Sequence, residues 1–103
     1  MRTAMTYMHS KPAGILEELD QGKLYRFSYL KEYKGEPISL IMPVRESPYE
    51  FDGFPPFFDG LLPEGSMLEG LLRQMKIDRK DMFSQLLAVG HEMVGAVTVE
   101  KIS

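Results

Sequence analysis

The side chains of this sequence that could perform acid–base chemistry near neutral pH are its two histidines, His9 and His91. His91 is followed by Glu92, and a neighbouring carboxylate can orient an imidazole as a general base. The same histidine also follows a predicted helix, where the helix dipole favours a positively charged side chain. His9 falls in a predicted turn. We favour the structural interpretation of both, so the histidines predict no catalytic centre.

Nucleophilic and metal-binding patterns are missing as well. There is no cysteine, which excludes disulfides, thiolate nucleophiles and thiolate zinc sites. The serines show no G-x-S-x-G pattern, and the glycines form neither a Walker A loop nor G-x-G-x-x-G. The aspartates are dispersed, and Glu17 and Glu18 would point to opposite faces of a strand. The sequence therefore predicts no enzyme, no cofactor and no metal site.

Three carboxylates, Asp59, Glu64 and Glu69, gather around two predicted helix starts. Carboxylates at such positions complement the helix dipole by about 0.3–1 kcal/mol each, which is a sufficient structural explanation. The functional alternative is that this acidic cluster, flanked by aromatic residues and Met67, meets a basic cleft on a partner protein. Among functions, partner binding is favoured over catalysis.

The composition limits the class of protein. A chain of 103 residues fits a single domain, residues 1–103, with one hydrophobic core. The net charge of −3 and the pI near 5.3 argue against direct binding of nucleic acid. No segment approaches the roughly 18 apolar residues that span a membrane. We expect a cytoplasmic protein that contacts no membrane.

The first half of the sequence predicts β-strands. Residues 4–8 and 13–18 are separated by turn residues, and residues 23–29 alternate strictly, with Tyr25, Phe27 and Tyr29 on the face expected to pack inward. Residues 37–42 also predict a short strand because they are rich in β-forming residues. Residues 45–56 contain three prolines, so we expect a connection there and no central strand.

The second half predicts short helices and a closing strand. One short helix is expected at residues 57–62, and a second begins at Ser66, which has capping-box spacing to Glu69. Asp78 and Asp81 are expected to open a third helix, which Gly90 ends in a left-handed conformation. The apolar positions of all three helices are expected to be core, including the set Phe57, Phe58, Leu61, Leu62, Leu68, Leu71 and Leu72.

The predicted fold class is α+β. Residues 93–100 return to strand periodicity and would close the sheet. A mostly antiparallel sheet from the N-terminal half plus this C-terminal strand would pack with two or three short helices, which bury one face of the sheet.

Three stretches resemble a known family signature. They are PISL at residues 37–40, FFDGLLPEG at 57–65 and VGAVT at 94–98. In this order and spacing they resemble the N-terminal subdomain of HipA-type serine/threonine kinase toxins, from about Thr6 to Val99. In long members of that family this subdomain precedes the kinase core, sits against it and carries no catalytic residue.

The resemblance also implies partners. A small separate chain of this kind looks like HipS, the antitoxin family of the tripartite HipBST systems. That likeness implies a HipT-type serine/threonine kinase toxin as partner and a HipB-like DNA-binding protein in a ternary complex. It implies neutralisation of the kinase by non-covalent docking near its active site. The alternatives are a structural completion subunit that stabilises or activates the kinase, and an orphan remnant of a truncated kinase gene.

The resemblance places the partner-binding segment around the two helix starts. Relatives often carry a bulky aromatic residue directly after LLPEG, whereas this sequence has Ser66 and Met67 and no tryptophan. Either Met67 fills the partner's pocket in place of the aromatic residue, or inhibition depends on holding the kinase in an inactive shape. The predicted partner-binding residues are Phe57, Phe58, Asp59, Pro63, Glu64, Gly65, Ser66 and Met67.

Overall fold

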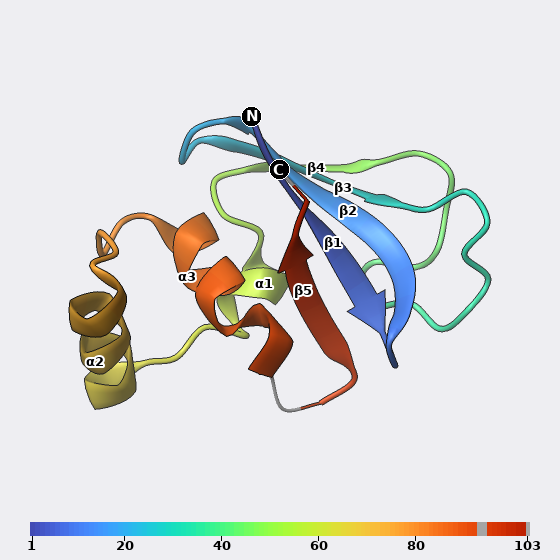
Figure 1. Ribbon diagram of the computed structural model, residues 1–103. Coiled ribbons are helices and arrows are strands. Elements are labelled where there is room, and N and C mark those ends of the chain that lie inside the picture. Colours follow the sequence, from blue (N-terminus) through green and yellow to red (C-terminus); the bar gives the residue numbers. More distant parts are fainter. Residues whose placement is uncertain (93–94, 103) are drawn as a thin grey trace.

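The computed structural model describes residues 1–92 and 95–102 and contains a five-stranded antiparallel sheet (Figure 1). Its strands are β1 (Arg2–Met8), β2 (Lys11–Asp20), β3 (Leu24–Tyr29), β4 (Tyr49–Asp52) and β5 (Val97–Lys101). They lie in the order β4-β3-β2-β1-β5. The first three strands follow one another as a meander, because tight turns join them. The C-terminal strand then pairs with β1 in antiparallel register.

The helices follow β4 in the chain. They are α1 (Pro56–Asp59), α2 (Gly65–Met75), α3 (Met82–Val89) and the 3-10 turn η1 (Gly90–Glu92). In Figure 1, α1 and α3 cover one face of the sheet and α2 stands farther out, beyond α3. These elements confirm the predicted α+β class with a closing C-terminal strand.

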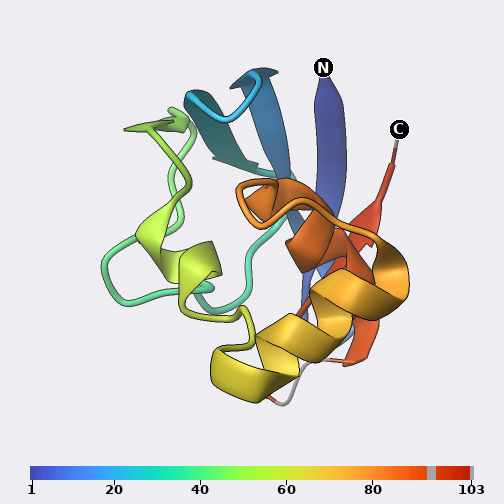
Figure 2. The ribbon, with the colours of Figure 1, turned by 90° about the vertical axis from the view of Figure 1, so that its left-hand side faces the viewer.

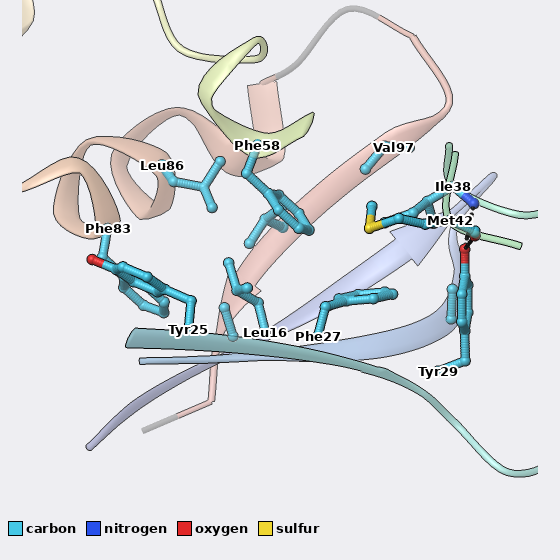
Figure 3. Close-up of a cluster of buried hydrophobic side chains, with 13 residues drawn as sticks. Leu16, Tyr25, Phe27, Tyr29, Ile38, Met42, Phe58, Phe83, Leu86 and Val97 are labelled. Atoms are coloured by element: carbon cyan, nitrogen blue, oxygen red, sulfur yellow. Dashed lines mark hydrogen bonds between the residues drawn. The ribbon is translucent and has the colours of Figure 1, made fainter. Parts of the chain in front are cut away.

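The core lies between the sheet and the two covering helices. Tyr25, Phe27 and Tyr29 are all buried on one face of β3, as the alternation predicts. The ring of Phe58 from α1 lies 5.8 Å from that of Phe27, and the ring of Phe83 from α3 stacks on Tyr25 at 6.4 Å (Figure 3). Each covering helix thus contributes an aromatic ring to one aromatic row of the sheet.

The prediction of a strand at residues 37–42 is wrong. This segment forms a turn with one isolated bridge, between Ser39 and Met42. The hydroxyl of Tyr29 accepts a hydrogen bond from the amide of Ile38 and donates one to the carbonyl of Met42. A side chain from β3 therefore satisfies backbone groups that a neighbouring strand would otherwise pair.

The expectation of an irregular connection at residues 45–56 missed the strand β4. It pairs with β3 alone and so forms an edge of the sheet. Pro48 precedes it and Pro55 follows it, so neither proline removes a hydrogen bond from the ladder. Prolines are tolerated at such flanking positions of an edge strand.

The closing strand is shorter than predicted. It begins at Val97, with Val97 and Val99 buried, while residues 93 and 94 of the predicted strand lie outside the described residues.

Gly90 does not end α3 in a left-handed conformation, because its φ is −57°. It is needed for close packing, since a Cβ at this position would lie 2.2 Å from the carbonyl oxygen of Val99.

The start of α3 also differs in detail. Asp81 is the N-cap, and its carboxylate accepts a hydrogen bond from the amide of Ser84 at 3.2 Å. Asp78 lies outside the helix and accepts from the amide of Lys80 at 2.8 Å. The two aspartates therefore do not form a capping box, although one of them caps the helix as aspartate commonly does.

Candidate interaction surface

The eight predicted partner-binding residues lie on α1, on the start of α2 and in the connection between them. Asp59, Glu64, Gly65, Ser66 and Met67 are exposed. Pro63 and Phe57 are half-buried, and Phe58 is fully buried in the core. The structure therefore brings these residues together along one segment of chain, with Phe58 as its attachment to the sheet.

The short helix α1 owes its position to prolines and aromatic rings. Pro55 is the N-cap residue and Pro56 takes the first helical position, where its fixed φ suits a helix start. The Phe57 ring packs edge-on against Phe58 at 5.2 Å. The helix ends at Asp59, so the predicted helix at 57–62 covers a helix and the turn after it.

The start of α2 differs from the predicted capping box. The N-cap residue is Glu64, and no side chain caps the helix. Gly65 enters the helix with a φ of 60°, a left-handed conformation that glycine adopts without steric cost. Glu69 does not reach back to the N-cap, because its carboxylate pairs with the guanidinium of Arg79. A favourable ion pair with the segment before α3 replaces the expected cap.

The apolar face of α2 is not part of the core. None of its residues is buried, and the side chains of Met67 and Met75 are 75% and 56% exposed. Leu68, Leu71 and Leu72 are only half-buried, so the prediction that they belong to the core is wrong. Figure 2 shows α2 in front of α3 and away from the sheet. Because α1 and α3 already cover the sheet, α2 has no apolar surface left to pack on there.

The negative charge of this segment is concentrated on two residues. Asp59 and Glu64 are exposed, and within the described residues neither forms an ion pair. Glu69 is the third member of the predicted acidic cluster, and Arg79 compensates its charge. The acidic character therefore belongs to the connection between α1 and α2 more than to α2 itself.

A charged network that sequence reasoning missed holds α3 against the sheet. Arg2 on β1 donates to Glu18 at 2.7 Å and to Asp81 at 2.9 Å, and the hydroxyl of Tyr25 donates to Glu18 at 2.8 Å. Partners so far apart in the chain leave no local sequence signal. The network is structural, because it joins three strands to the cap of a helix.

The pKa values of this network reflect burial and pairing. Desolvation raises the pKa of Glu18, but hydrogen bonds from Arg2, Tyr25 and the Gly22 amide lower it by more, so the net pKa lies below its ordinary value. The pKa of Asp81 is also lowered, because bonds from Arg2 and Ser84 outweigh desolvation. Burial and the bond to Glu18 raise the pKa of Tyr25. Both carboxylates are therefore held in the charged form.

Both histidines lie on the surface. His9 is exposed in the β1–β2 turn with a φ of 51°, and His91 is exposed in η1.

Among the described residues, no group of three or more His, Cys, Asp or Glu side chains is arranged to hold a metal ion. In the same part of the chain, every helix is too short or too polar to cross a membrane.

A second exposed apolar feature was also missed. Leu40 and Ile41 stand at the tip of the 39–42 turn with 97% and 77% of their surface exposed. Their position between Pro37 and Pro43 was the available signal, because prolines on both sides favour a turn over a strand.

Comparison with known proteins identifies the family. The model of the HipA N-terminal domain family matches residues 4–100. A protein of Haemophilus influenzae described as uncharacterised is 35% identical over 101 residues, which is 98% of this chain and 93% of that protein. A solved structure described as the N-terminal domain of HipA toxin matches with a TM-score of 0.76 and 31% identity, over 100% of this chain and 94% of that one. The chain therefore belongs to the HipA N-terminal domain family.

Proposed function

We propose that this protein is an antitoxin that binds a HipA-type serine/threonine kinase toxin, of the HipT kind, and neutralises it by non-covalent docking near the active site. The observation that supports this most directly is α2, an amphipathic helix with none of its residues buried. An apolar helix face that its own chain covers only in part suits a domain that packs against another protein. Membership of the HipA N-terminal domain family makes a HipA-type kinase the natural candidate.

The charge of the segment between α1 and α2 suits the same partner. A kinase cleft holds the phosphates of ATP with cationic groups, including a conserved lysine and metal ions. Asp59 and Glu64 are exposed and lie on the segment that leads into α2. Their carboxylates would be attracted to such a cleft and would orient the protein as it approaches.

Met67 is the side chain proposed to enter the kinase. It lies in the first turn of α2 and is 75% exposed. Its unbranched thioether can adapt to an irregular apolar pocket. Phe57 would contribute its half-buried ring at the rim, while Phe58 is fully buried and would support the segment from within.

Co-expression with the HipA-type kinase encoded nearest to this chain in its genome tests the proposal. An antitoxin restores growth and abolishes kinase activity in a reconstituted phosphorylation assay. A completion subunit would leave toxicity unchanged or increase it, and would raise the activity of the purified kinase. The second result would refute neutralisation even if a stable complex forms.

Single substitutions test the proposed segment. Met67→Ala and Glu64→Ala should each weaken neutralisation and leave the thermal midpoint nearly unchanged, because both side chains are exposed. Gln74→Ala is a matched control, since it changes another exposed position of α2. Full protection by both of the first two variants would show that this segment does not inhibit the kinase.

The proposal includes a third component, a HipB-like DNA-binding protein in a cytoplasmic ternary complex. The net charge of −3 suits a role in which another chain contacts DNA. Light scattering on the three co-purified chains would give the mass of the assembly, and a mass that excludes any one chain would contradict it.

A further inference from the structure

The turn at residues 39–42 presents two large aliphatic side chains to solvent. Leu40 is 97% exposed and Ile41 is 77% exposed, while Ile38 and Met42 on either side are buried. A single exposed leucine is ordinary on a protein surface. Two adjacent ones at the tip of a turn whose ends are fixed in the core form a small apolar projection.

The backbone of this turn is held in place by hydrogen bonds. The amide of Met42 donates to the carbonyl of Ser39 at 3.0 Å, and the amide of Ile41 donates to the Ser39 hydroxyl at 3.3 Å. The Tyr29 hydroxyl bonds to both ends, at Ile38 and Met42. Ordering this turn on binding would therefore cost little conformational entropy, which is the property of a preorganised contact.

The chain that follows is fixed in the same way. The hydroxyl of Tyr49 donates to the carbonyl of Pro43 at 2.6 Å. The guanidinium of Arg45 lies 3.6 Å from the centre of the Tyr49 ring and donates to the carbonyl of Ser47 at 3.1 Å. The projection therefore stands on a loop that non-covalent contacts hold in place along its length.

The turn borders the segment that carries the proposed function. Figure 3 shows the Met42 side chain pointing toward the ring of Phe58 from α1, and both residues belong to one buried cluster. In Figure 2 the loop that contains residues 38–44 runs beside α1. The exposed tip of the turn and the connection between α1 and α2 therefore flank the same short helix.

We propose that the 39–42 turn is an anchoring plug that inserts Leu40 and Ile41 into an apolar socket on the same kinase. This inference depends on the proposed function for the identity of the partner. In it, the plug determines how tightly the two proteins bind, whereas residues 63–67 determine inhibition. Insertion into an apolar socket would remove both aliphatic side chains from water, and this burial of apolar surface favours binding.

A second copy of this chain is the competing occupant, and charged side chains in two hollows of the described surface oppose it. One hollow, with a volume of about 640 Å³, has the apolar residues Met8, Pro12 and Tyr33 in its lining beside the charged residues Lys11, Glu32, Lys34 and Glu36. The hollow beside Val44 is lined by Lys31, Arg45 and Glu46 as well as Tyr29. Burying aliphatic groups in either hollow would also remove water from charged side chains, and this desolvation opposes self-association.

The test is the affinity of the double variant Leu40→Ser/Ile41→Ser for the same kinase, measured by isothermal titration calorimetry with the full chain. Its thermal midpoint should match that of the parent, since both side chains are exposed. The dissociation constant should rise by roughly 100-fold or more. At saturating concentration the variant should still inhibit the kinase completely. Ile102→Ser is the matched control, because Ile102 is 49% exposed at the other end of the chain and should leave the affinity unchanged.

Each outcome bears on the inference separately from the proposed function. A double variant that binds within about threefold of the parent overturns the plug, and neutralisation by the parent would still stand. In another outcome, the parent is a dimer in solution and the double variant a monomer, while both bind the kinase with the same affinity. That result also overturns the plug, because the turn would then mediate self-association. A parent that binds the kinase without inhibiting it refutes the antitoxin, while loss of that binding in the double variant still supports the plug. A parent that does not bind the kinase refutes both.

Discussion

The position of α2 outside the core can be tested by comparing two leucine-to-alanine substitutions. Leu86 on α3 is fully buried, whereas Leu71 on α2 is half-buried. Both lie inside helices, and alanine is at least as good a helix former as leucine, so the difference between the variants reports packing. The sequence alone predicts that the two cost the same, because each belongs to the apolar stripe of its helix.

The structure predicts different losses. Removing a fully buried leucine costs about 2–5 kcal/mol, because a cavity forms where the side chain was. Fully burying a leucine contributes about 1.5–3 kcal/mol, so a partly exposed one that leaves no closed cavity should cost less than this. We therefore expect Leu86→Ala to lose clearly more free energy of unfolding than Leu71→Ala.

Urea unfolding followed by circular dichroism at 222 nm measures both losses. With a slope of about 1–3 kcal/mol per molar urea, Leu86→Ala should lower the midpoint by about 1 M or more, and Leu71→Ala by clearly less. Equal losses would refute the reasoning, because they would mean that the apolar face of α2 is buried within the isolated chain. The argument for a partner on that face would then fail as well.

Three further predictions concern the sheet and its covering helix. Gly90→Ala should lower the thermal midpoint strongly, because its Cβ would lie 2.2 Å from the Val99 carbonyl oxygen; a shift of under about 4 °C would contradict this. Thr6→Val should raise the midpoint, because the buried Thr6 hydroxyl has no hydrogen-bond partner among the described residues and an unsatisfied buried group costs about 1–3 kcal/mol; a lower midpoint would contradict it. The free energy of unfolding should fall in acid, because the folded-state pKa values of Glu18 and Asp81 lie below their ordinary 4.5 and 3.8. The two carboxylates contribute their full stabilisation above those ordinary values, and this contribution is lost as the pH falls through the lower folded-state values. Urea midpoints between pH 6 and pH 2 measure this loss, and Glu18→Gln should reduce its size.

The regular part of the fold could be predicted from local patterns. The strict alternation around Phe27 identifies β3 and its inward face, because a half-buried strand must alternate. The apolar spacing in α3 identifies Phe83 and Leu86 as core positions, and both are buried. These elements follow their intrinsic periodicity, since each packs one face against the sheet.

The parts that could not be predicted depend on distant residues. Residues 37–42 have strand propensity, but a hydroxyl from Tyr29 pairs their backbone and makes a turn. Periodicity identifies α2 as amphipathic, yet it cannot say whether the apolar face meets the sheet or solvent. That depends on how much of the sheet α1 and α3 already cover.

The candidate interaction surface was predicted as a segment but not in its details. The sequence located residues 57–67 and their charges, and the structure places them along one stretch of surface. The sequence could not show which of Phe57 and Phe58 is fully buried, because adjacent phenylalanines give the same signal. For Ile41 the only sequence signal is its place between two prolines, which favours a turn but does not show that the side chain is exposed.

The pairing of β1 with β5 has a consequence for synthesis. Ala4 lies opposite Lys101, so the β1–β5 pairing joins residues that are almost 100 positions apart in the sequence. Closing so large a loop is slow compared with forming local hairpins. A nascent chain whose final strand is still inside the ribosome would expose the outer edge of β1 and lack the core side chains of Val97 and Val99. The sheet can therefore be completed only after β5 has left the ribosome, which delays the moment at which a newly made molecule can engage any partner.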